Sequence, residues 1–489
     1  MKEEEKLKVP GYEYFKEAST ASQAACFVLG FDEVDCLDDI GGQQFLVDEV
    51  LPKEYAKPFS HINLYTVDSL LRPVNKELGM VVAEVLRDWN MLAAESFVER
   101  AERGKKICYN YFTQSPEVIL ALDMVPMCVE VIGAIDALLY DADTCSASVD
   151  RFEAEGYPDF LCSGQKVALG MHLLGKVPCP DAFLKQPSIC DPSNAQYDWW
   201  AEKCKVPHIL FEAPYYANER AFRFFLSEYK RHIKELEELS GNKLDEGKLR
   251  EYVKLGNEAL SYHLKTQVLK AAVPCPDTGW HAIIDSAALT MLGQPYALDF
   301  FKANYEIVKG RVDRGEGVIP EGKEELRCYW GWGFNGYDLH FMDWLEDEYG
   351  ATWTGCSLSY IPKFVGLVDT TNMDTMIESL AWRMFNWPMS RQGMSFSELW
   401  VNDTLSAARE LKADCLMMGT HRSCRHFWAL NKILSDRVTD ELDIPSLRFE
   451  FDLFEHRFTP DSELKKITGD FLSSLNYSKL HKKREARYK

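Results

Sequence analysis

The sequence alternates between strand-like and helix-like segments in two separate blocks, one near residues 107–212 and one near residues 326–451. The predicted strands of the first block are Ile107–Phe112, Pro126–Ile132, Ala182–Ile189 and His208–Glu212. Those of the second block are Leu326–Trp330, Thr352–Ser357, Asp414–Gly419 and Ser446–Phe451. Strands that alternate with helices form parallel sheets. We therefore expect an α/β protein with two parallel-sheet domains of the flavodoxin or Rossmann type.

The segments outside these blocks have helical patterns, which predicts four regions. We expect a helical N-terminal region over 1–104, a first α/β domain over 105–216, a helical connector over 217–322 and a second α/β domain over 323–489. The clearest single helix is Asn218–Leu239, whose apolar residues recur on one face. Asn218 is a suitable N-cap for it, and Gly241 is a suitable stop. The order of the strands within each sheet is not predicted by the sequence.

The charge of the chain restricts its partners. The formal net charge is −21, which is unsuited to binding nucleic acid or an anionic membrane surface. The first ten residues contain no apolar signal core, and acidic residues interrupt the most apolar stretch, Val118–Tyr140. We therefore predict a cytoplasmic protein.

The cysteines have no local metal or redox motif. The 14 cysteines include no C-x-x-C pair, so a zinc finger and a thioredoxin-type motif are both excluded. Cytoplasmic cysteines are normally reduced. If cysteines bind metal here, they must come from distant segments of the chain.

Three cysteines stand directly before predicted helices. Cys162 precedes a helical run that starts near Gln165, Cys190 precedes Asp191-Pro192, and Cys424 follows the strand Asp414–Gly419. A helix N-terminus lowers the pKa of a thiol and favours the thiolate, which is the form that binds metal. Ligands also collect at the carboxyl ends of parallel strands, where Cys190 and Cys424 are expected. All other cysteines, including Cys179 and Cys204, are expected to pack as small apolar residues.

The surroundings of these three cysteines resemble the motifs of a known family. The motifs are Glu153–Tyr157 with Leu161-Cys162-Ser163, Ser188-Ile189-Cys190-Asp191 with Trp199-Trp200, and His421–Arg425 with Phe451–Phe454 downstream. They are similar to the cysteine motifs of the 2-hydroxyacyl-CoA dehydratase and benzoyl-CoA reductase family. The chain looks most like a D-component-type subunit of 2-hydroxyglutaryl-CoA dehydratase, from about Gly104 to Leu475. Gly164 and Gln165 depart from the aromatic and basic pair that the family has after its first cysteine.

The resemblance implies a cofactor, partners and a reaction. It implies a [4Fe-4S] cluster held by Cys162, Cys190 and Cys424, with one iron left open to the substrate. It also implies a homologous second subunit, a separate ATP-hydrolysing activator and an acyl-CoA substrate. The implied reaction is syn elimination of water from an (R)-2-hydroxyacyl-CoA through a ketyl radical. Under this interpretation His421 and Arg422 take part in catalysis, and Arg422 and Arg425 hold the CoA. Two alternatives within the resemblance are ATP-dependent ring reduction and a double-cubane cluster reductase.

A rival function rests on a glycine-rich turn. Gly331–Gly336 is a literal G-x-G-x-x-G after a predicted strand, which is the context of an NAD- or flavin-binding fingerprint. Trp332 and Phe334 would crowd a pyrophosphate there, and the next strand ends in Gly355-Cys356-Ser357, not in an acid that binds ribose. The family resemblance implies instead that this aromatic turn lines an acyl pocket, and a tight turn between strand and helix without a chemical role is the remaining alternative.

Three further sequence features complete the expectations. The chain contains no G-x-x-x-x-G-K-[ST], so ATP binding by a P-loop is not expected on it. Glu212 ends a predicted strand; it is a candidate base, but a capping or structural role is expected ahead of that. The segment Cys275–His281 resembles a substrate-facing loop of the family.

Overall fold

The structure of this chain is a computed structural model. It describes residues 1–30, 51–59, 61–140, 142–186, 190–319, 323–333, 335–395 and 397–487. Ser188, Ile189 and Phe334, which were part of the sequence expectations, lie outside the described residues.

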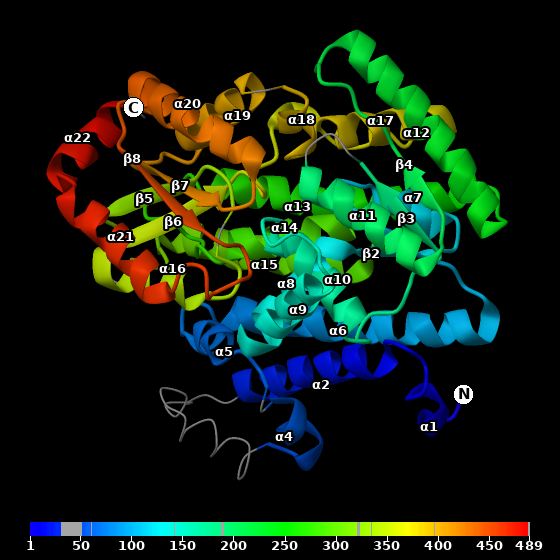
Figure 1. Cartoon of the computed structure of the whole chain (residues 1–489). Coiled ribbons are helices and arrows are strands. Elements are labelled where there is room, and N and C mark those ends of the chain that lie inside the picture. Colours follow the sequence, from blue (N-terminus) through cyan, green and yellow to red (C-terminus); the bar gives the residue numbers. More distant parts are fainter. Residues whose placement is uncertain are drawn as a thin grey trace.

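Two four-stranded sheets organise the chain, and every strand pair in them is parallel (Figure 1). The first sheet contains β1 (Ile107–Asn110), β2 (Val125–Cys128), β3 (Ala182–Lys185) and β4 (His208–Leu210), in the order β2-β1-β3-β4. The second contains β5 (Leu326–Trp330), β6 (Ala351–Cys356), β7 (Cys415–His421) and β8 (Ser446–Phe451), in the order β6-β5-β7-β8. The predicted α/β class with two parallel sheets is confirmed. Both sheets have the same order, which places a switch point between β1 and β3 and between β5 and β7.

Several predicted strands are longer than the observed ones, and the largest error among the described residues concerns β2. The run Pro126–Ile132 was expected to be extended, but the strand stops at Cys128, and Val129 begins the helix α8 (Val129–Leu139). The residues are apolar in both segments, and a short apolar run does not distinguish a buried strand from the start of a buried helix.

The first sheet is buried on both faces, as parallel sheets usually are. Cys108 and Leu184 point to one face, where they pack with α7 (Pro116–Ala121), α12 (Glu219–Ser240) and α13 (Glu246–Leu269). Tyr109 and Phe183 point to the other face and contact Trp200 of α11 (Asp191–Cys204). The alternation of these side chains matches the two-residue period of a strand.

The helices around the sheets follow local sequence signals. The side chain of Asn218 accepts a hydrogen bond of 2.9 Å from the backbone N–H of Ala221 at the start of α12, and the helix ends at Gly241 with φ 73°. Both caps were predicted from the sequence. The N-terminal helices α2 (Tyr12–Leu29) and α6 (Lys76–Arg103) lie side by side beneath the sheets in Figure 1. No helix among the described residues is both long and apolar enough to cross a membrane.

The remaining helices complete the layers above and below the sheets. They are α1 (Glu3–Lys6), α4 (Lys53–Phe59), α5 (Leu64–Leu71), α9 (Ala142–Ala154), α10 (Ser163–Leu173), α14 (His281–Ala288), η2 (Leu289–Met291), α15 (Pro295–Arg314), α16 (His340–Tyr349), η4 (Lys363–Val365), α17 (Met373–Phe385), α18 (Ser390–Gly393), α19 (Glu398–Glu410), α20 (Arg425–Leu442), α21 (Asp461–Ser474) and α22 (Tyr477–Arg487).

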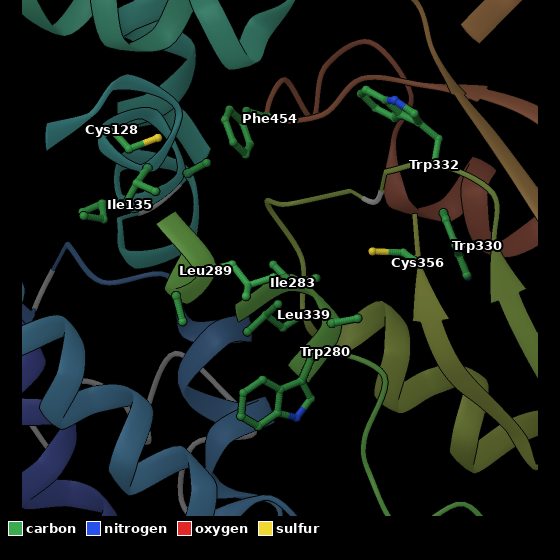
Figure 2. Packing of buried hydrophobic residues seen from close by; sticks show 14 of the residues in the cluster. Cys128, Ile135, Trp280, Ile283, Leu289, Trp330, Trp332, Leu339, Cys356 and Phe454 are labelled. Atoms are coloured by element: carbon green, nitrogen blue, oxygen red, sulfur yellow. The ribbon is translucent and has the colours of Figure 1, made fainter. Parts of the chain in front are cut away.

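The two α/β parts share one apolar core and several buried polar contacts. Figure 2 shows Ile283 and Leu289 of the connector between Ile135 of α8 and the strand-end residues Trp330 and Cys356. Arg383 of α17 forms an ion pair with Glu117 of α7 at 2.6 Å, and the side chains are 3% and 0% exposed. The boundaries of the four expected regions stay a prediction, but the two sheets lie within residues 107–210 and 326–451.

The expectation that Cys179 and Cys204 pack as ordinary reduced cysteines is wrong. The structure joins them in a disulfide, and both residues are partly exposed. They are 25 residues apart in the chain, so their pairing depends on how α10, β3 and α11 fold together, which no local pattern reveals.

Candidate functional site

Three cysteines from three helix starts line one cavity of about 580 Å³. Cys162 is the N-cap of α10, Cys190 is the N-cap of α11 and Cys424 is the N-cap of α20. Cys190 follows β3 and Cys424 follows β7, which are equivalent strands beside the switch points of the two sheets. The fold therefore brings together three cysteine side chains that are up to 262 positions apart in the sequence, from 162 to 424.

The sulfurs of these three cysteines are not grouped as one tetrahedral ion would hold them. Among the described residues, the sulfur atoms of Cys162, Cys190 and Cys424 are not all within 4.8 Å of one another. One tetrahedral ion with metal–sulfur bonds of about 2.3 Å would hold its sulfurs about 3.8 Å apart. In an iron–sulfur cluster the cysteine thiolates bind different irons, so they stand further apart. The donor set and the cavity thus fit such a cluster.

Burial raises the pKa of all three thiols, contrary to the expectation from the helix dipole. It raises the pKa of Cys162 well above the ordinary value, raises that of Cys190 and raises that of Cys424 to about 11. Negative charge on Cys190 or Cys424 further raises the pKa of Cys162. Backbone N–H groups of the first helical turns oppose this, at Gly164 for Cys162 and at Ser193 for Cys190, but their effect is smaller. Without a cation the thiols keep their protons, so metal binding must release them.

His421 is oriented toward Cys162 by the backbone. Its Nδ1 accepts a hydrogen bond of 3.2 Å from the backbone N–H of Leu453. Burial lowers the pKa of His421, so the ring is neutral and its proton is on Nε2. Nε2 lies 3.0 Å from Sγ of Cys162 and donates to it. The indole of Trp332 is parallel to the imidazole, with the ring centres 5.9 Å apart, which restricts rotation of the ring.

Of the other polar residues predicted for the site, one lines the large cavity and two do not. Arg425 lines the large cavity, with its guanidinium 5.2 Å from the ring centre of Phe160. Arg422 is not in the lining, and its guanidinium stacks 4.2 Å over Phe458. Glu212 is exposed and lines neither this cavity nor the smaller one described below.

The segment Cys275–His281 does not face the site. Asp277 and His281 are buried and bonded to each other, and Asp277 also pairs with Lys270 at 2.6 Å. None of these residues lines either cavity. The helix that His281 begins, α14, does contribute to the smaller cavity through Ile283, Ser286 and Ala287.

A second, smaller cavity of about 140 Å³ adjoins the first. The two share Cys162, Cys190, Trp332 and Met389. Its lining is mostly apolar, and among the described residues it contains no Lys, Arg or His. The cysteines therefore separate a larger, more polar space from a small apolar one.

Glu130 is a lining residue of this small cavity that sequence reasoning missed. The side-chain amide of Gln165 donates to its carboxylate at 2.9 Å, and the thiol of Cys128 donates at 3.2 Å. Burial raises the pKa of Glu130 to about 7. A signal was present in the sequence, because Glu130 is an acid in the apolar run Val125–Ile135 directly after a strand, where ligands of parallel sheets bind.

In the glycine-rich turn Gly331–Gly336, the missing side chains of two glycines make space for neighbouring side chains of the protein. A Cβ atom at Gly331 would clash with the sulfur of Met418, and one at Gly336 would lie 2.8 Å from the ring of Phe454. The next helix, α16, begins at His340, so the turn does not lead directly into a helix N-terminus. Gly331 and Gly336 therefore permit packing against β7 and the segment after β8, which explains these two glycines without a dinucleotide.

Comparison with known proteins identifies the family. Residues 112–475 match the profile of the 2-hydroxyglutaryl-CoA dehydratase D-component family. The chain belongs to this family. The match covers the second sheet, the strands β2, β3 and β4 of the first sheet, and all three cysteine motifs.

Characterised relatives are distant. The chain is 24% identical over 397 residues to the (R)-phenyllactyl-CoA dehydratase alpha subunit of Clostridium sporogenes, covering 78% of this chain and 93% of the relative. It is 24% identical over 291 residues to the (R)-2-hydroxyglutaryl-CoA dehydratase subunit alpha of Acidaminococcus fermentans, covering 58% and 57%. It is 21% identical over 342 residues to the (R)-2-hydroxyisocaproyl-CoA dehydratase alpha subunit of Clostridioides difficile, covering 65% and 78%.

Proposed function

We propose that this chain is the iron–sulfur subunit of an ATP-activated (R)-2-hydroxyacyl-CoA dehydratase. The observation that carries the proposal is the convergence of Cys162, Cys190 and Cys424 on one cavity at equivalent ends of two parallel sheets. Family membership supports the assignment to a dehydratase subunit.

The three cysteines would hold a [4Fe-4S] cluster in the large cavity. When bound, the cluster supplies single electrons and one iron without a protein ligand. Two of the chain's own contacts would orient one of the cluster's ligands: His421 donates a hydrogen bond to Cys162, and Trp332 stacks on His421. These contacts hold the ligand sulfur in one orientation, as outer-shell partners of metal ligands do.

The small cavity supports a proposal for the acyl group of the substrate. An apolar cavity of about 150 Å³ is large enough for a benzene ring, and this one is about 140 Å³. Its lining holds the carboxyl of Glu130 and, among the described residues, no cation. We therefore infer that an uncharged, phenyl-sized or branched acyl group binds there, whereas a second carboxylate is disfavoured. Arg425 in the large cavity is positioned to meet the phosphates of CoA.

Glu130 is the candidate proton acceptor. It lines the small cavity beside Cys162 and Cys190, and its pKa of about 7 allows it to take and return a proton near neutral pH. Gln165 orients one of its oxygens at 2.9 Å. We infer that Glu130 accepts the β-proton of the bound acyl group as the hydroxyl leaves.

The subunit would act with partners in the cytoplasm. Phe160 and Tyr215 line the mouth of the large cavity and are 52% and 60% exposed. Aromatic side chains of this kind are typical of interfaces. We propose that a homologous second subunit covers this surface and that a separate ATP-hydrolysing activator delivers the electron.

The ratio of ATP hydrolysed to product formed tests the proposed reaction. Dehydration returns the electron after each turnover, so we expect far less than one ATP per product with an aromatic (R)-2-hydroxyacyl-CoA under anaerobic conditions. Ring reduction consumes its electrons, so a constant ratio near two would overturn the dehydratase assignment in favour of the reductase branch. Omitting the activator should abolish turnover in either case.

A further inference from the structure

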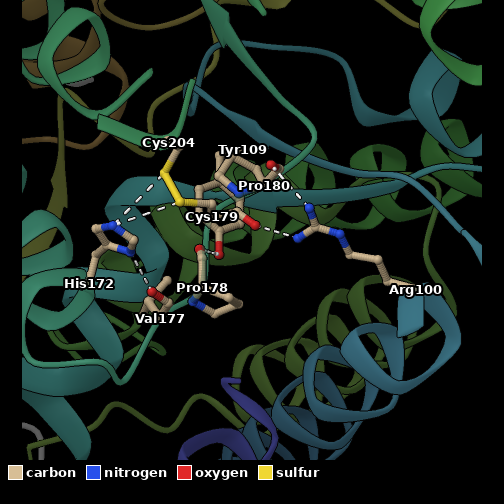
Figure 3. The surroundings of a disulfide bond; sticks show 8 residues. All are labelled: Arg100, Tyr109, His172, Val177, Pro178, Cys179, Pro180 and Cys204. Carbon is tan, nitrogen blue, oxygen red and sulfur yellow. Dashed lines mark hydrogen bonds between the residues drawn. A yellow bond between two sulfur atoms is a disulfide. The ribbon is translucent and has the colours of Figure 1, made fainter. Parts of the chain in front are cut away.

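A second sulfur-containing group lies at the opposite ends of the helices that begin at Cys162 and Cys190. Cys179 is in the segment between α10 and β3, and Cys204 is the last residue of α11. They form a disulfide with Cα atoms 5.6 Å apart. His172, near the end of α10, completes the group, and its Nε2 lies 3.9 Å from the sulfur of Cys179 and 3.8 Å from that of Cys204 (Figure 3).

The tautomer of His172 is fixed by the backbone. Nδ1 lies 2.7 Å from the carbonyl oxygen of Val177. A carbonyl oxygen only accepts hydrogen bonds, so Nδ1 carries the proton and donates it. Nε2 of the neutral ring therefore presents its lone pair to the two sulfurs. Burial also lowers the pKa of His172, which favours this neutral form.

This arrangement is that of a metal-binding histidine. Such histidines almost always donate their other ring N–H to a backbone carbonyl or a carboxylate, which orients the ligating nitrogen. The three ligand atoms of His172, Cys179 and Cys204 all lie within 4.8 Å of one another, and among the described residues no other such trio of His, Cys, Asp and Glu ligand atoms occurs. All three residues are partly exposed, so an ion can reach them from solvent.

We propose that, once the disulfide is reduced, His172, Cys179 and Cys204 bind one Zn²⁺ ion. A dithiol reductant supplies two electrons and two protons to break the S–S bond, and is itself oxidised to a disulfide. Binding of Zn²⁺ then releases the two thiol protons to solvent and forms two Zn–S bonds and one Zn–N bond. Two sulfurs and one nitrogen are a ligand set that zinc favours, and a water molecule completes the tetrahedron. The sulfurs must separate to about 3.8 Å, which their side chains on two different segments allow.

The segment that bears Cys179 is held independently of the ion. The guanidinium of Arg100 donates to the carbonyl oxygens of Cys179 and Pro180, and the hydroxyl of Tyr109 donates to that of Pro178 at 2.8 Å (Figure 3). Neither contact involves sulfur, so both remain when the disulfide opens. Nearby, the ammonium of Lys203 pairs with Glu155 at 3.2 Å, which reduces its repulsion of a cation.

The site would keep α10 and α11 joined in a reducing compartment. Their N-termini present Cys162 and Cys190, and their C-terminal ends meet at His172 and Cys204. Disulfides are rarely maintained in the cytosol. A zinc ion bound by the same residues preserves the connection when the disulfide is lost. The inference does not depend on the proposed dehydratase activity, because it concerns other cysteines.

Metal analysis of the full chain tests the proposal. The protein is purified anaerobically with a phosphine reductant, incubated with ZnSO₄, dialysed, and analysed for zinc and iron together. We expect about one zinc per chain. His172→Ala and Cys204→Ser should each lose most of that zinc with unchanged iron, whereas Cys26→Ser should keep both, because Cys26 belongs neither to this trio nor to the lining of the large cavity. Thermal unfolding of each variant confirms that it is folded.

Two measurements on the wild-type chain do not depend on the stability of any variant. Oxidation of the wild-type chain with a thiol oxidant should release the zinc and protect Cys179 and Cys204 from alkylation. Replacing zinc with Co²⁺ in the reduced chain should produce a thiolate-to-cobalt band in the difference spectrum. Reduced wild-type protein that binds no zinc, or zinc binding that survives both oxidation and His172→Ala, would overturn the proposal.

Discussion

The hydrogen bond from His421 to Cys162 should tune the reduction potential of the bound cluster. Nε2 and Sγ are 3.0 Å apart in a buried site, and a hydrogen bond to a charged acceptor is worth about 1.5–3 kcal/mol. Reduction adds negative charge to the cluster and its sulfurs, so the bond is stronger in the reduced state. If the difference is about 1 kcal/mol, the one-electron potential changes by about 40 mV. His421→Ala should therefore lower the potential by about that amount.

The assay is a redox titration of the anaerobic protein followed by electron paramagnetic resonance. His426→Ala is the matched control, because His426 lines the same cavity but its ring makes no described contact with a cysteine sulfur. We expect the potential of His426→Ala to differ from that of the wild type by only a small part of the shift expected for His421→Ala. An unchanged or raised potential in His421→Ala would refute the assigned direction of the hydrogen bond.

Three further predictions address stability, proton transfer and substrate binding. Arg383→Met should lower the free energy of unfolding by about 3–5 kcal/mol, because it leaves the carboxylate of Glu117 buried without a cation; in thermal unfolding, the double variant with Glu117→Gln should recover most of the loss. Burial raises the pKa of Glu130 from 4.5 to about 7. Between these two pH values the folded chain keeps a proton on Glu130 that the unfolded chain has released. The free energy of unfolding therefore falls as the pH rises through this range. Glu130→Gln should remove this penalty and raise the free energy of unfolding above that of the wild type by at most about 3 kcal/mol above pH 7. The same variant should lose the rise of kcat through pH 7. Equal pH profiles of kcat for the variant and the wild type would contradict the role of Glu130. Arg425→Gln should raise KM for the CoA thioester about tenfold with little change in kcat, as loss of one charged contact worth about 1.4 kcal/mol implies; steady-state kinetics with unchanged KM would exclude it from CoA binding.

Local signals explain why much of the fold was predictable. Leu326–Trp330 is a strand at the predicted bounds because apolar and aromatic residues are continuous there. Asn218 and Gly241 are the caps of α12 because both act through the backbone within one turn. The placement of Cys162, Cys190 and Cys424 at helix N-termini follows from the same kind of local pattern.

Properties that depend on tertiary packing were not predictable. Strand order comes from long-range pairing, as between Cys328 of β5 and Cys415 of β7. The raised pKa of Cys162 comes from burial, which outweighs the local effect of the helix N-terminus. Arg422 and Arg425 are neighbours in sequence but take different directions at the start of α20. The pairing of Cys179 with Cys204 likewise requires the packed arrangement of two helices.

The iron and acid-labile sulfide content of the anaerobically purified chain tests the central claim most directly. We expect about four iron atoms per chain in the wild type and in Cys26→Ser, whose cysteine lies in α2 and does not line the large cavity. Cys162→Ser, Cys190→Ser and Cys424→Ser should each retain less than half of that iron. Full iron content in all three variants, or a folded wild-type chain that takes up no iron and sulfide on reconstitution, would contradict the assignment of these cysteines as cluster ligands.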